Sequence, residues 1–483
     1  MKLSSLLKGV QTRQIVGDSD PEIQEIEFDS RRVQSGSLFV AVSGTQVDGH
    51  TFIDKSIEQG AAAVVCEQLP EQLSDQVVYV VVEKSQAALG QLCANFYGNP
   101  VQDLVLVGIT GTNGKSTTVT LLHQLFNMLG LRSGLISTIR YMVGNEEFPS
   151  SHTTPDPKQL HRLFAEMKEA GCEYCFMEVS SHSLIQDRVE GIPFKVGAFT
   201  NITHDHLDYH GTFKAYIAAK KLLFDGLGPD SVAIINVDDK HGQVMVQNTQ
   251  ATVKTFAQKR MADYRVRMLE NSFEGLLLEI DGMETWFKLL GSFNAYNLVM
   301  VYAIARELGL ERDEVLRTLS NLEGVDGRFQ VLRSSGNKLG IVDYAHTPDA
   351  LQNVLGTIQD INKGSQQVIT VVGCGGNRDK AKRPKMAQIA TNLSDKVVLT
   401  SDNPRNEPPA QILDDMMAGV PEGSKRKVLR IEDRTEGIRT ACLLANPGDI
   451  ILVAGKGHED YQEIQGKKIP FDDRKILLEQ LNL

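Results

Sequence analysis

Residues 104–118 read Leu104-Val-Leu-Val-Gly-Ile-Thr-Gly-Thr-Asn-Gly-Lys-Ser-Thr-Thr118, and the fold of the surrounding chain follows from them. The nearly continuous apolar run over 104–109 is typical of a buried parallel strand. From residue 115 to about residue 129 the pattern becomes helical, and Gly130 is suited to end that helix. The stretch therefore predicts a strand, a glycine-rich loop and a helix in direct succession.

The loop between this strand and this helix has the chemistry of a phosphate site. Gly111 and Gly114 permit a tight turn whose backbone N–H groups can face an anion. Lys115 offers a cation to the β- and γ-phosphates, and Ser116 or Thr117 offers a hydroxyl to Mg²⁺. The dipole at the helix N-terminus favours the same anion. These residues predict the binding of a nucleoside triphosphate.

One position departs from the general phosphate-loop pattern G-x-x-x-x-G-K-[ST]. The first glycine of that pattern would fall at Ile109, and Gly108 comes one residue early. A glycine-rich turn in an unrelated α/β protein is the alternative interpretation. Because strand, loop, Lys-Ser pair and helix follow in the correct order, the nucleotide site is favoured.

The bulk composition is that of an ordinary globular protein. The chain has 483 residues, of which 41% are hydrophobic and 23% charged, and this length predicts about three domains. Its net charge of 50 − 61 = −11 argues against sequence-independent nucleic-acid binding, and no apolar stretch reaches the ~18 residues of a membrane span. Six cysteines, with one isolated C-x-x-C at Cys172 and Cys175, fit a reducing compartment. We therefore expect a cytoplasmic protein with no nucleic-acid partner and no membrane insertion. A monomer with small-molecule substrates is a separate expectation, which the composition does not determine.

The expected fold class is α/β with three domains. Residues 1–98 predict a small N-terminal α/β domain that ends at Asn99-Pro100. Residues 99–329 predict a central phosphate-loop ATPase domain with a mostly parallel sheet. Residues 330–483 alternate strands and helices, which predicts a C-terminal Rossmann-like, doubly wound domain.

Polar residues of the central domain follow its predicted strands, where open α/β sheets bind ligands. Glu178 ends a strand over 174–179 and is either a Mg²⁺ ligand or a surface carboxylate. Residues 204–210 hold three histidines and two aspartates, similar to the H-x-H-x-D-H pattern of dinuclear metallohydrolases but one residue too long. We expect one or two of these groups to serve Mg²⁺ or ATP and the other histidines to be structural. Lys220 lies in a helix predicted over 212–226, and nothing local distinguishes it from other lysines.

In the C-terminal domain, charged residues follow the strands predicted over 368–372, 396–400 and 449–453. Arg378, Asp402, Arg405 and Glu459 would together form a pocket for a zwitterion. The alternative is a set of solvated surface charges. Gly373-Cys-Gly-Gly376 superficially suggests dinucleotide binding, but it does not match G-x-G-x-x-G.

Three stretches in order resemble the motifs of the Mur ligase family: Thr110 to Thr117, Asn201 to Gly211 with Lys220, and Asp343 to Pro348. The first includes that family's early glycine, and the resemblance extends from about residue 29 to residue 460. Within the family, Asp402-Asn-Pro-Arg405 resembles the signature of the branch that adds meso-2,6-diaminopimelate. The lysine-adding branch lacks this arginine and is the nearest alternative. Diaminopimelate is lysine with one additional carboxylate, which the planar fork of an arginine can bind through two hydrogen bonds.

The resemblance implies a role for each matching residue. Contacts to ATP are implied for Gly111, Thr112, Asn113, Gly114, Lys115, Ser116, Thr117, Asn294, Arg328, Asp343 and His346. Contacts to a UDP-muramoyl-dipeptide, bound at its uridine end by the N-terminal domain, are implied for Phe28, Ser30, Thr45, Gln46, Val47, His152, Thr153, Thr154, Ser180, Gln186 and Arg188. The diaminopimelate pocket would comprise Arg378, Asp402, Asn403, Pro404, Arg405, Gly455 and Glu459. Mg²⁺ would be held by Ser116, Glu178, His206 and Lys220, the last as a carbamate.

The resemblance also implies a reaction, in which Lys115, Glu178, His206 and Lys220 would be catalytic. ATP would phosphorylate the γ-carboxylate of D-glutamate in UDP-N-acetylmuramoyl-L-alanyl-D-glutamate, and an amine of the amino acid would displace the phosphate. Domain closure about hinges near residues 99 and 330 would bring the amine to the acyl phosphate. Two other classes of protein stay open: a regulatory NTPase switch, and a metallohydrolase centred on residues 204–210.

Overall fold

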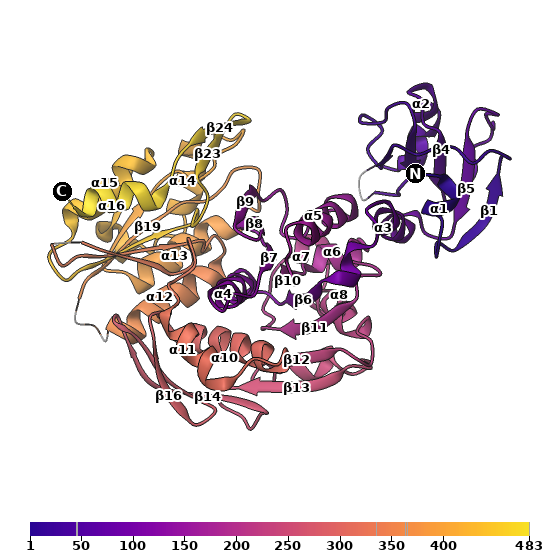
Figure 1. Cartoon of the computed structure of the whole chain (residues 1–483). Coiled ribbons are helices and arrows are strands. Elements are labelled where there is room, and N and C mark those ends of the chain that lie inside the picture. The colour runs from indigo at the N-terminus through magenta and orange to yellow at the C-terminus, as the bar shows by residue number, and fades with distance from the viewer. Residues whose placement is uncertain (45–46, 335, 363, 365, 483) are drawn as a thin grey trace. The chain divides into compact units, whose positions relative to one another are not determined.

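The computed structural model describes residues 1–44, 47–334, 336–362, 364 and 366–482, and Figure 1 shows its helices and strands. The chain divides into two compact units. Unit 1 comprises residues 1–264 and 300–310, and unit 2 comprises residues 265–299 and 311–483. Among the described residues, no helix has both the length and the hydropathy required to cross a bilayer. The domain boundaries at residues 98 and 329 stay a prediction.

The N-terminal part of unit 1 is a five-stranded sheet in the order β1-β5-β4-β3-β2. Only β1 runs antiparallel to its neighbour. The strands are β1 (Thr12–Val16), β2 (Glu25–Glu27), β3 (Ser37–Val40), β4 (Ala63–Cys66) and β5 (Val78–Val82), and the helices are α1 (Leu3–Leu6), α2 (Ile53–Glu58) and α3 (Ser85–Phe96). The interior strands β3 to β5 are buried along their whole length, which fits their almost continuous apolar sequences.

The rest of unit 1 is organised around β6 (Val105–Thr110), which lies inside a sheet ordered β13-β12-β11-β6-β10-β7-β8-β9. Strands β6, β7, β10, β11, β12 and β13 are parallel, and β8 and β9 add an antiparallel edge. Helix α4 (Lys115–Met128) follows the glycine loop, as predicted. The remaining bounds are β7 (Ser133–Ile136), β8 (Arg140–Val143), β9 (Glu146–Pro149), α5 (Pro157–Glu169), β10 (Tyr174–Glu178), α6 (Ser181–Ile185), β11 (Phe194–Phe199), α7 (Leu207–His210), α8 (Phe213–Asp225), β12 (Val232–Asn236), α9 (Gly242–Met245) and β13 (Thr252–Ala257).

Unit 2 contains a meander that the sequence analysis did not predict. Strands β14 (Tyr264–Ser272), β15 (Gly275–Ile280) and β16 (Met283–Phe287) pair in antiparallel register, with the first residue of β14 still in unit 1. Strands β14 and β16 mix buried and exposed positions, so no continuous apolar run marks them, whereas β15 has no exposed position. Helices α10 (Ser292–Glu307), of which residues 300–307 belong to unit 1, and α11 (Arg312–Asn321) follow.

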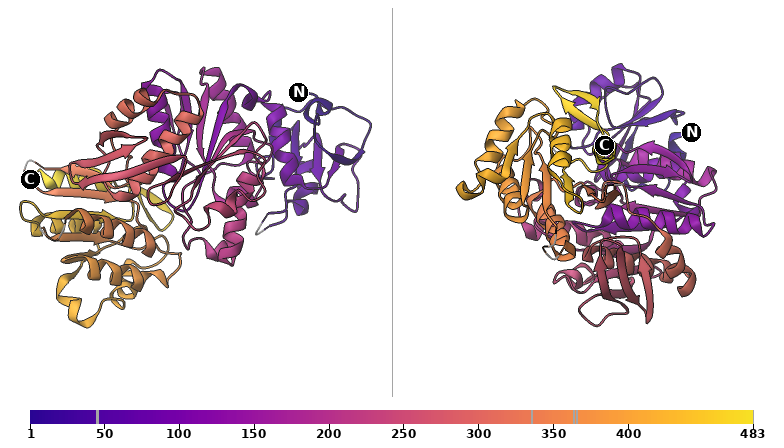
Figure 2. Two further views of the ribbon diagram at one scale, coloured as in Figure 1. Left: turned by 90° about the horizontal axis from the view of Figure 1, so that it is seen from below. Right: turned by 90° about the vertical axis from the view of Figure 1, so that its left-hand side faces the viewer.

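The C-terminal sheet has the order β17-β18-β22-β19-β20-β21. It is parallel except for β17 at one edge, and it carries helices on both faces (Figure 2), which confirms the predicted doubly wound fold. Its strands are β17 (Gln330–Arg333), β18 (Leu339–Asp343), β19 (Val368–Val372), β20 (Lys396–Leu399), β21 (Val428–Arg430) and β22 (Ile450–Ala454). Helices α12 (Pro348–Asn362), α13 (Lys382–Leu393) and α14 (Pro409–Met417) cover one face, and α15 (Arg434–Leu444) and α16 (Asp473–Leu481) cover the other. A separate hairpin, β23 (Tyr461–Ile464) and β24 (Lys467–Pro470), was not predicted.

Candidate active site

The phosphate loop is held open by glycine and by the end of the neighbouring strand β11. Gly111 has a φ of +146°, and a Cβ there would lie 1.8 Å from Oγ1 of Thr200. The backbone N–H of Thr112 donates to the carbonyl oxygen of Asn201 at 2.8 Å, and the N–H of Asn113 donates to the Asn201 side-chain oxygen at 3.0 Å. The loop therefore has a defined shape that a side chain at position 111 would destroy.

Two lysines donate to one carbonyl oxygen of this loop. Nζ of Lys115 lies 3.0 Å from the Gly111 oxygen, and Nζ of Lys220 lies 2.7 Å from the same atom. Lys220 is only 1% exposed, although it lies on α8, far along the chain. Burial lowers the pKa of Lys220 well below its usual range, and the charge of Lys115 lowers it further. Tertiary structure thus distinguishes Lys220 from the other lysines: its amine is buried, has a lowered pKa and lies against the nucleotide loop.

Glu178 is a buried carboxylate at the same edge of the sheet. It ends β10 opposite Ile109 of the neighbouring strand β6, and it is 1% exposed. Its Oε1 accepts a hydrogen bond from the backbone N–H of Thr138 at 2.8 Å. The interpretation of Glu178 as a surface carboxylate is therefore wrong. A carboxylate oxygen next to the phosphate loop is a suitable ligand for Mg²⁺, as is the hydroxyl of Ser116 in the first turn of α4.

The histidines of unit 1 divide between a cluster and separate structural positions. The rings of His182 and His206 lie 4.8 Å apart, and burial together with neighbouring imidazoles lowers the pKa of His182 to about 4. His210 contacts the hydroxyl of Ser181 at 2.9 Å, and His204 stacks on Phe213. Nowhere in the described part of the chain do three His, Cys, Asp or Glu side chains converge as a metal-binding group. The arrangement does not support the metallohydrolase alternative.

Four residues predicted to bind the muramoyl-dipeptide are linked to Glu178. Oγ1 of Thr154 donates to the Glu178 carbonyl at 2.8 Å and accepts from the N–H of Ser180 at 3.1 Å. Nη1 of Arg188 donates to the Thr154 carbonyl at 2.8 Å, and its Nε and Nη2 donate to Oε1 of Gln186. The structure therefore brings these side chains together beside the phosphate loop.

The other residues predicted for this substrate lie in loops or in the N-terminal sheet. Oγ1 of Thr153 accepts from Thr138 at 3.0 Å, while the side chain of His152 is exposed. Phe28 packs against the N-terminal core, Ser30 is buried, and Val47 is exposed. Two predicted residues, Thr45 and Gln46, lie outside the described residues.

Four residues predicted to contact ATP belong to unit 2. Asp343, at the end of β18, accepts from the N–H of Phe329 at 2.7 Å, and burial raises its pKa to about 6 although Arg328 opposes the shift. The Arg328 guanidinium lies 4.8 Å from the centre of the Tyr344 ring. The other two are His346, whose Nδ1 contacts the Tyr344 carbonyl, and Asn294, which is 4% exposed in the first turn of α10.

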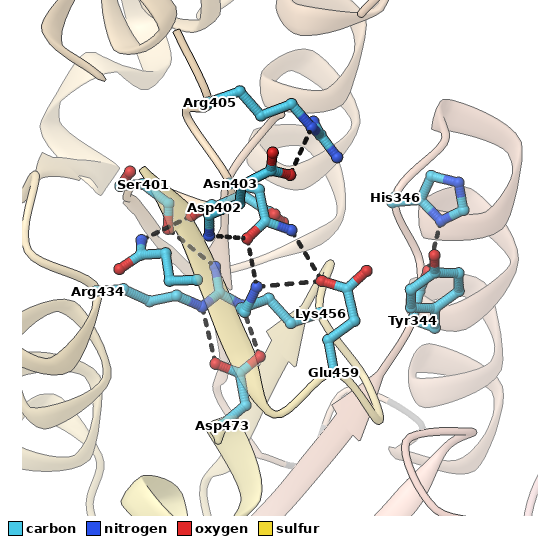
Figure 3. Close-up of polar contacts among 12 residues, drawn as sticks. Tyr344, His346, Ser401, Asp402, Asn403, Arg405, Arg434, Lys456, Glu459 and Asp473 are labelled. Atoms are coloured by element: carbon cyan, nitrogen blue, oxygen red, sulfur yellow. Dashed lines mark hydrogen bonds and ion pairs between the residues drawn. The ribbon is translucent and has the colours of Figure 1, made fainter. Parts of the chain in front are cut away.

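The predicted amino-acid pocket is a buried network (Figure 3). Oδ1 of Asn403 accepts from Nζ of Lys456 and from the N–H of Glu463, each at 2.9 Å. This orients the amide so that Nδ2 donates to Oε2 of Glu459 at 2.8 Å, which also accepts from Lys456 at 3.1 Å. Lys456 is fully buried, and Asp402 is 7% exposed. Burial alone would raise the pKa of Asp402, but Lys456 and Arg434 together lower it, so the carboxylate stays charged.

Arg405 lies at the rim of this network in a left-handed conformation, with a φ of +51°. Its Nε donates to Oε2 of Glu463 at 3.1 Å, and its Nη1 donates to the carbonyl of Gly376 at 2.9 Å. Asp402 is buried, and Arg405 and Glu459 are half-buried, so the interpretation of this set as solvated charges is wrong for these three. It does describe Arg378, which is exposed.

Several residues of this region were missed by sequence reasoning. Arg434 and Asp473 form a buried pair through contacts of 2.8 and 2.7 Å, and Nη2 of Arg434 also donates to the Ala454 carbonyl at the end of β22. Lys456 stands inside the motif Gly455-Lys-Gly-His-Glu459, which was a usable signal. By contrast, no sequence signal marked Arg434 and Asp473, which are single charged residues at the starts of α15 and α16.

The glycines of Gly373-Cys-Gly-Gly376 have a packing role. A Cβ at Gly376 would lie 1.9 Å from the Pro404 carbonyl, and one at Gly373 would lie 2.4 Å from the Thr400 carbonyl. The loops that follow β19 and β20 therefore pass each other backbone to backbone. This close approach, and not dinucleotide binding, accounts for the motif.

Comparison with known proteins identifies the family. Models of the Mur ligase family match three regions: the catalytic domain at residues 22–97, the middle domain at 109–305 and the glutamate ligase domain at 327–457. A protein of Cytophaga hutchinsonii named UDP-N-acetylmuramoyl-L-alanyl-D-glutamate–2,6-diaminopimelate ligase is 53% identical over 483 residues, which cover 100% of this chain and 99% of the relative. The chain belongs to the Mur ligase family. A second relative with the same name, from Phocaeicola vulgatus, is 52% identical to this Mur ligase over 99% of both chains.

A solved structure with that name is similar to this Mur ligase with a TM-score of 0.68 and 33% identity, and the match covers 95% of this chain and 94% of the other. The α/β fold and the three-domain architecture predicted from the sequence are thereby confirmed. Mur ligases are ATP-dependent enzymes that form amide bonds, so the alternative of a regulatory NTPase switch is wrong.

Proposed function

We propose that this Mur ligase joins meso-2,6-diaminopimelate to the γ-carboxylate of D-glutamate in UDP-N-acetylmuramoyl-L-alanyl-D-glutamate, with release of ADP and phosphate. Full-length relatives at about half identity carry that name. The observation that carries the proposal is the network around Asn403, in which carboxylates of Asp402 and Glu459 and the guanidinium of Arg405 surround one region at the carboxyl end of the C-terminal sheet. A zwitterionic group requires both charges in its site.

The first step joins two anions, the γ-phosphate of ATP and the glutamate carboxylate. The Lys115 ammonium and the N-terminal dipole of α4 would offset the charge that spreads over the phosphoryl group. Thr154, Gln186 and Arg188 would orient the dipeptide, because they form one hydrogen-bonded set next to Glu178. The product of this step is an acyl phosphate, whose carbonyl carbon the amine of the amino acid then attacks.

Mg²⁺ is a further part of the proposal, and the residues present fit it. Glu178 is a buried carboxylate, and Ser116 supplies a hydroxyl at the start of α4. The buried amine of Lys220, whose pKa burial lowers, is suited to take up carbon dioxide as a carbamate, which would add a second carboxylate. His206 is the fourth predicted ligand. When bound, Mg²⁺ would neutralise phosphate charge.

Arg405 provides the basis for selecting diaminopimelate over lysine. Lysine lacks the second carboxylate, so binding it would leave a half-buried guanidinium without its substrate partner. A site built around such a polar group rejects the analogue that lacks the matching group, by roughly 10⁴–10⁵-fold in favourable cases. The second candidate function is the addition of lysine in place of diaminopimelate. An assay that compares the two amino acids distinguishes the two functions.

The test is an end-point and rate assay on the full chain. Purified protein with UDP-N-acetylmuramoyl-L-alanyl-D-glutamate, ATP and Mg²⁺ should release ADP when diaminopimelate is added, and mass spectrometry should detect the tripeptide product. Equal or faster product formation with lysine would replace the proposal with the lysine-adding one, and no product with either amino acid would refute both. A monomeric state and a cytoplasmic location stay predictions.

A further inference from the structure

Arg383 is a fully buried arginine that no step described above uses. It lies near the start of α13, with its side chain 0% exposed. Nη1 and Nη2 donate to the two carboxylate oxygens of Glu407 at 3.0 and 2.9 Å, and Nη1 also donates to Asp415 of α14 at 2.8 Å. Nη2 lies a further 3.3 Å from the carbonyl oxygen of Gly375. One guanidinium therefore contacts both loops that follow β19 and β20.

Glu407 extends this link to the loop that carries Arg405. Its Oε1 accepts from the backbone N–H of Asn377, and the side chain of Asn377 in turn accepts from the N–H of Asn406 at 3.1 Å. The hydrogen bonds from Arg383 lower the pKa of Glu407 to about 2, so the carboxylate stays anionic at neutral pH. Arg383 and Glu407 thus join residues 375–377 to residues 405–407 through charge-assisted hydrogen bonds.

The two loops joined in this way hold strained backbone. Asn377 and Arg405 have φ values of +52° and +51°, in the left-handed region that non-glycine residues rarely adopt. Such conformations persist only where the surroundings determine them. The Arg405 guanidinium itself donates to the carbonyl of Gly376, which lies between Gly375 and Asn377. The position of Arg405 therefore depends on a loop that Arg383 and Glu407 hold.

We propose that Arg383, acting through Glu407, is a positioning residue that places the Arg405 guanidinium to receive the distal carboxylate of the incoming amino acid. This inference rests on the proposed function, because it assumes that Arg405 binds that carboxylate. Arg383 does not touch the substrate. It determines how well the Arg405 guanidinium is placed to bind the distal carboxylate. It thereby determines how strongly the enzyme prefers the amino acid with the additional carboxylate.

Two conservative variants test the link. Arg383→Lys keeps the positive charge but cannot contact both oxygens of Glu407 with a planar fork, and Glu407→Gln keeps the shape but loses the charge. For both, we expect KM for diaminopimelate to rise roughly tenfold to a hundredfold, the usual effect of misplacing a binding group by about 1 Å. The KM for the UDP-dipeptide and kcat at saturating diaminopimelate should stay within about twofold of the parent values.

The matched control is Arg430→Gln, which breaks an exposed 2.6 Å ion pair with Asp414, next to Asp415 on α14. It should leave all kinetic constants unchanged. Assays are run well below the thermal midpoint of each variant, so that a loss of folded protein lowers kcat alone. If Arg383 and Glu407 had a purely structural role, the variants would have a lower kcat and an unchanged KM for diaminopimelate. An unchanged KM for diaminopimelate in both variants, with or without a lower kcat, would therefore overturn the inference. Failure of the parent enzyme to join diaminopimelate would instead refute the proposed function.

Discussion

Nζ of Lys220 lies 2.7 Å from the carbonyl oxygen of Gly111, and 109 positions separate these two residues in the chain. The same oxygen accepts a hydrogen bond from Lys115, so two amines converge on one acceptor. Two ammonium groups so close together would repel each other, and burial together with the charge of Lys115 lowers the pKa of Lys220 well below its usual range. The neutral amine of Lys220 is therefore favoured far more than that of an exposed lysine.

Replacing the buried amine of Lys220 should abolish the reaction. We expect Lys220→Met, which keeps the buried methylene groups, to lower kcat by at least about 100-fold, the range found when an electrostatic group at the reacting centre is lost. Added acetate or formate should partly restore the rate if a carbamate on Lys220 supplies the missing carboxylate. Steady-state kinetics with and without these anions measure both effects. Lys221→Met, which changes the next residue on α8, is the control and should retain activity; full activity of Lys220→Met would exclude the role.

Removing the Arg405 side chain should weaken use of the amino acid. We expect Arg405→Ala to lower kcat/KM for diaminopimelate by the equivalent of about 2–5 kcal/mol, the usual cost of breaking a desolvated charge pair. The KM for ATP should be unaffected. The comparison variant Arg439→Ala removes a guanidinium from an exposed position on α15. Kinetics of Arg405→Ala equal to those of the parent would remove Arg405 from the pocket.

Lys456 should contribute to stability as well as to binding. In Lys456→Gln the carboxylate of Glu459 loses its buried cation and Asp402 keeps only Arg434, so we expect the free energy of unfolding of unit 2 to fall by about 3–5 kcal/mol. Denaturant titration of the full chain measures this change. Lys467→Gln, at an exposed position of β24, should have no comparable effect. A stability equal to that of the parent would show that the network does not depend on this ammonium.

Two glycines of unit 2 should respond in opposite directions to alanine. Gly376→Ala would place a methyl group 1.9 Å from the Pro404 carbonyl, so we expect a loss of about 1–3 kcal/mol in stability, with a higher KM for diaminopimelate. Gly356 lies inside α12 with open space around the added atom, and Gly356→Ala should gain about 0.5–1 kcal/mol. Thermal and denaturant unfolding measure both. An equal response at the two positions would contradict the close approach of the loops.

Asp343 should make stability depend on pH with a definite sign. Burial raises its pKa from 3.8 to about 6, so the folded chain holds this proton more tightly than the unfolded chain does. The contribution of Asp343 to stability is fully present below the unfolded pKa and is lost as pH rises through 6. The free energy of unfolding of the parent chain should therefore fall relative to that of Asp343→Asn by about 2 kcal/mol as the pH rises from about 4.5 to 7.

Unfolding free energies of the parent chain and of Asp343→Asn across this pH range provide the measurement. Asp360→Asn, an exposed position on α12, is the control and should show no such change with pH. A difference between the parent chain and Asp343→Asn that stays constant with pH would show that this carboxyl titrates normally.

Local sequence determined much of the architecture, because the spacing of apolar residues within a short stretch distinguishes a buried strand from a helix. The apolar run before Gly111 predicted β6, and the glycines with Lys115 predicted the nucleotide loop that follows it. Alternation of strands and helices beyond residue 330 predicted the doubly wound sheet. The meander β14 to β16 was missed because β14 and β16 mix buried and exposed residues. The dipeptide Asp281-Gly282, which joins β15 to β16 with both residues at positive φ, was a usable hairpin signal.

Tertiary structure alone decided which polar residues form the site. Lys220 and Lys221 are neighbours with the same chemistry, but only Lys220 is buried against the phosphate loop. Glu178 was equally consistent with a surface position until β10 was placed beside β6. A side chain's charge is local information, whereas its burial and its partner depend on distant segments, such as the 109 positions between Lys220 and Gly111. The sequence by itself therefore determined the loop and the layers of this protein, and the packing of distant segments decided which charges became buried and paired.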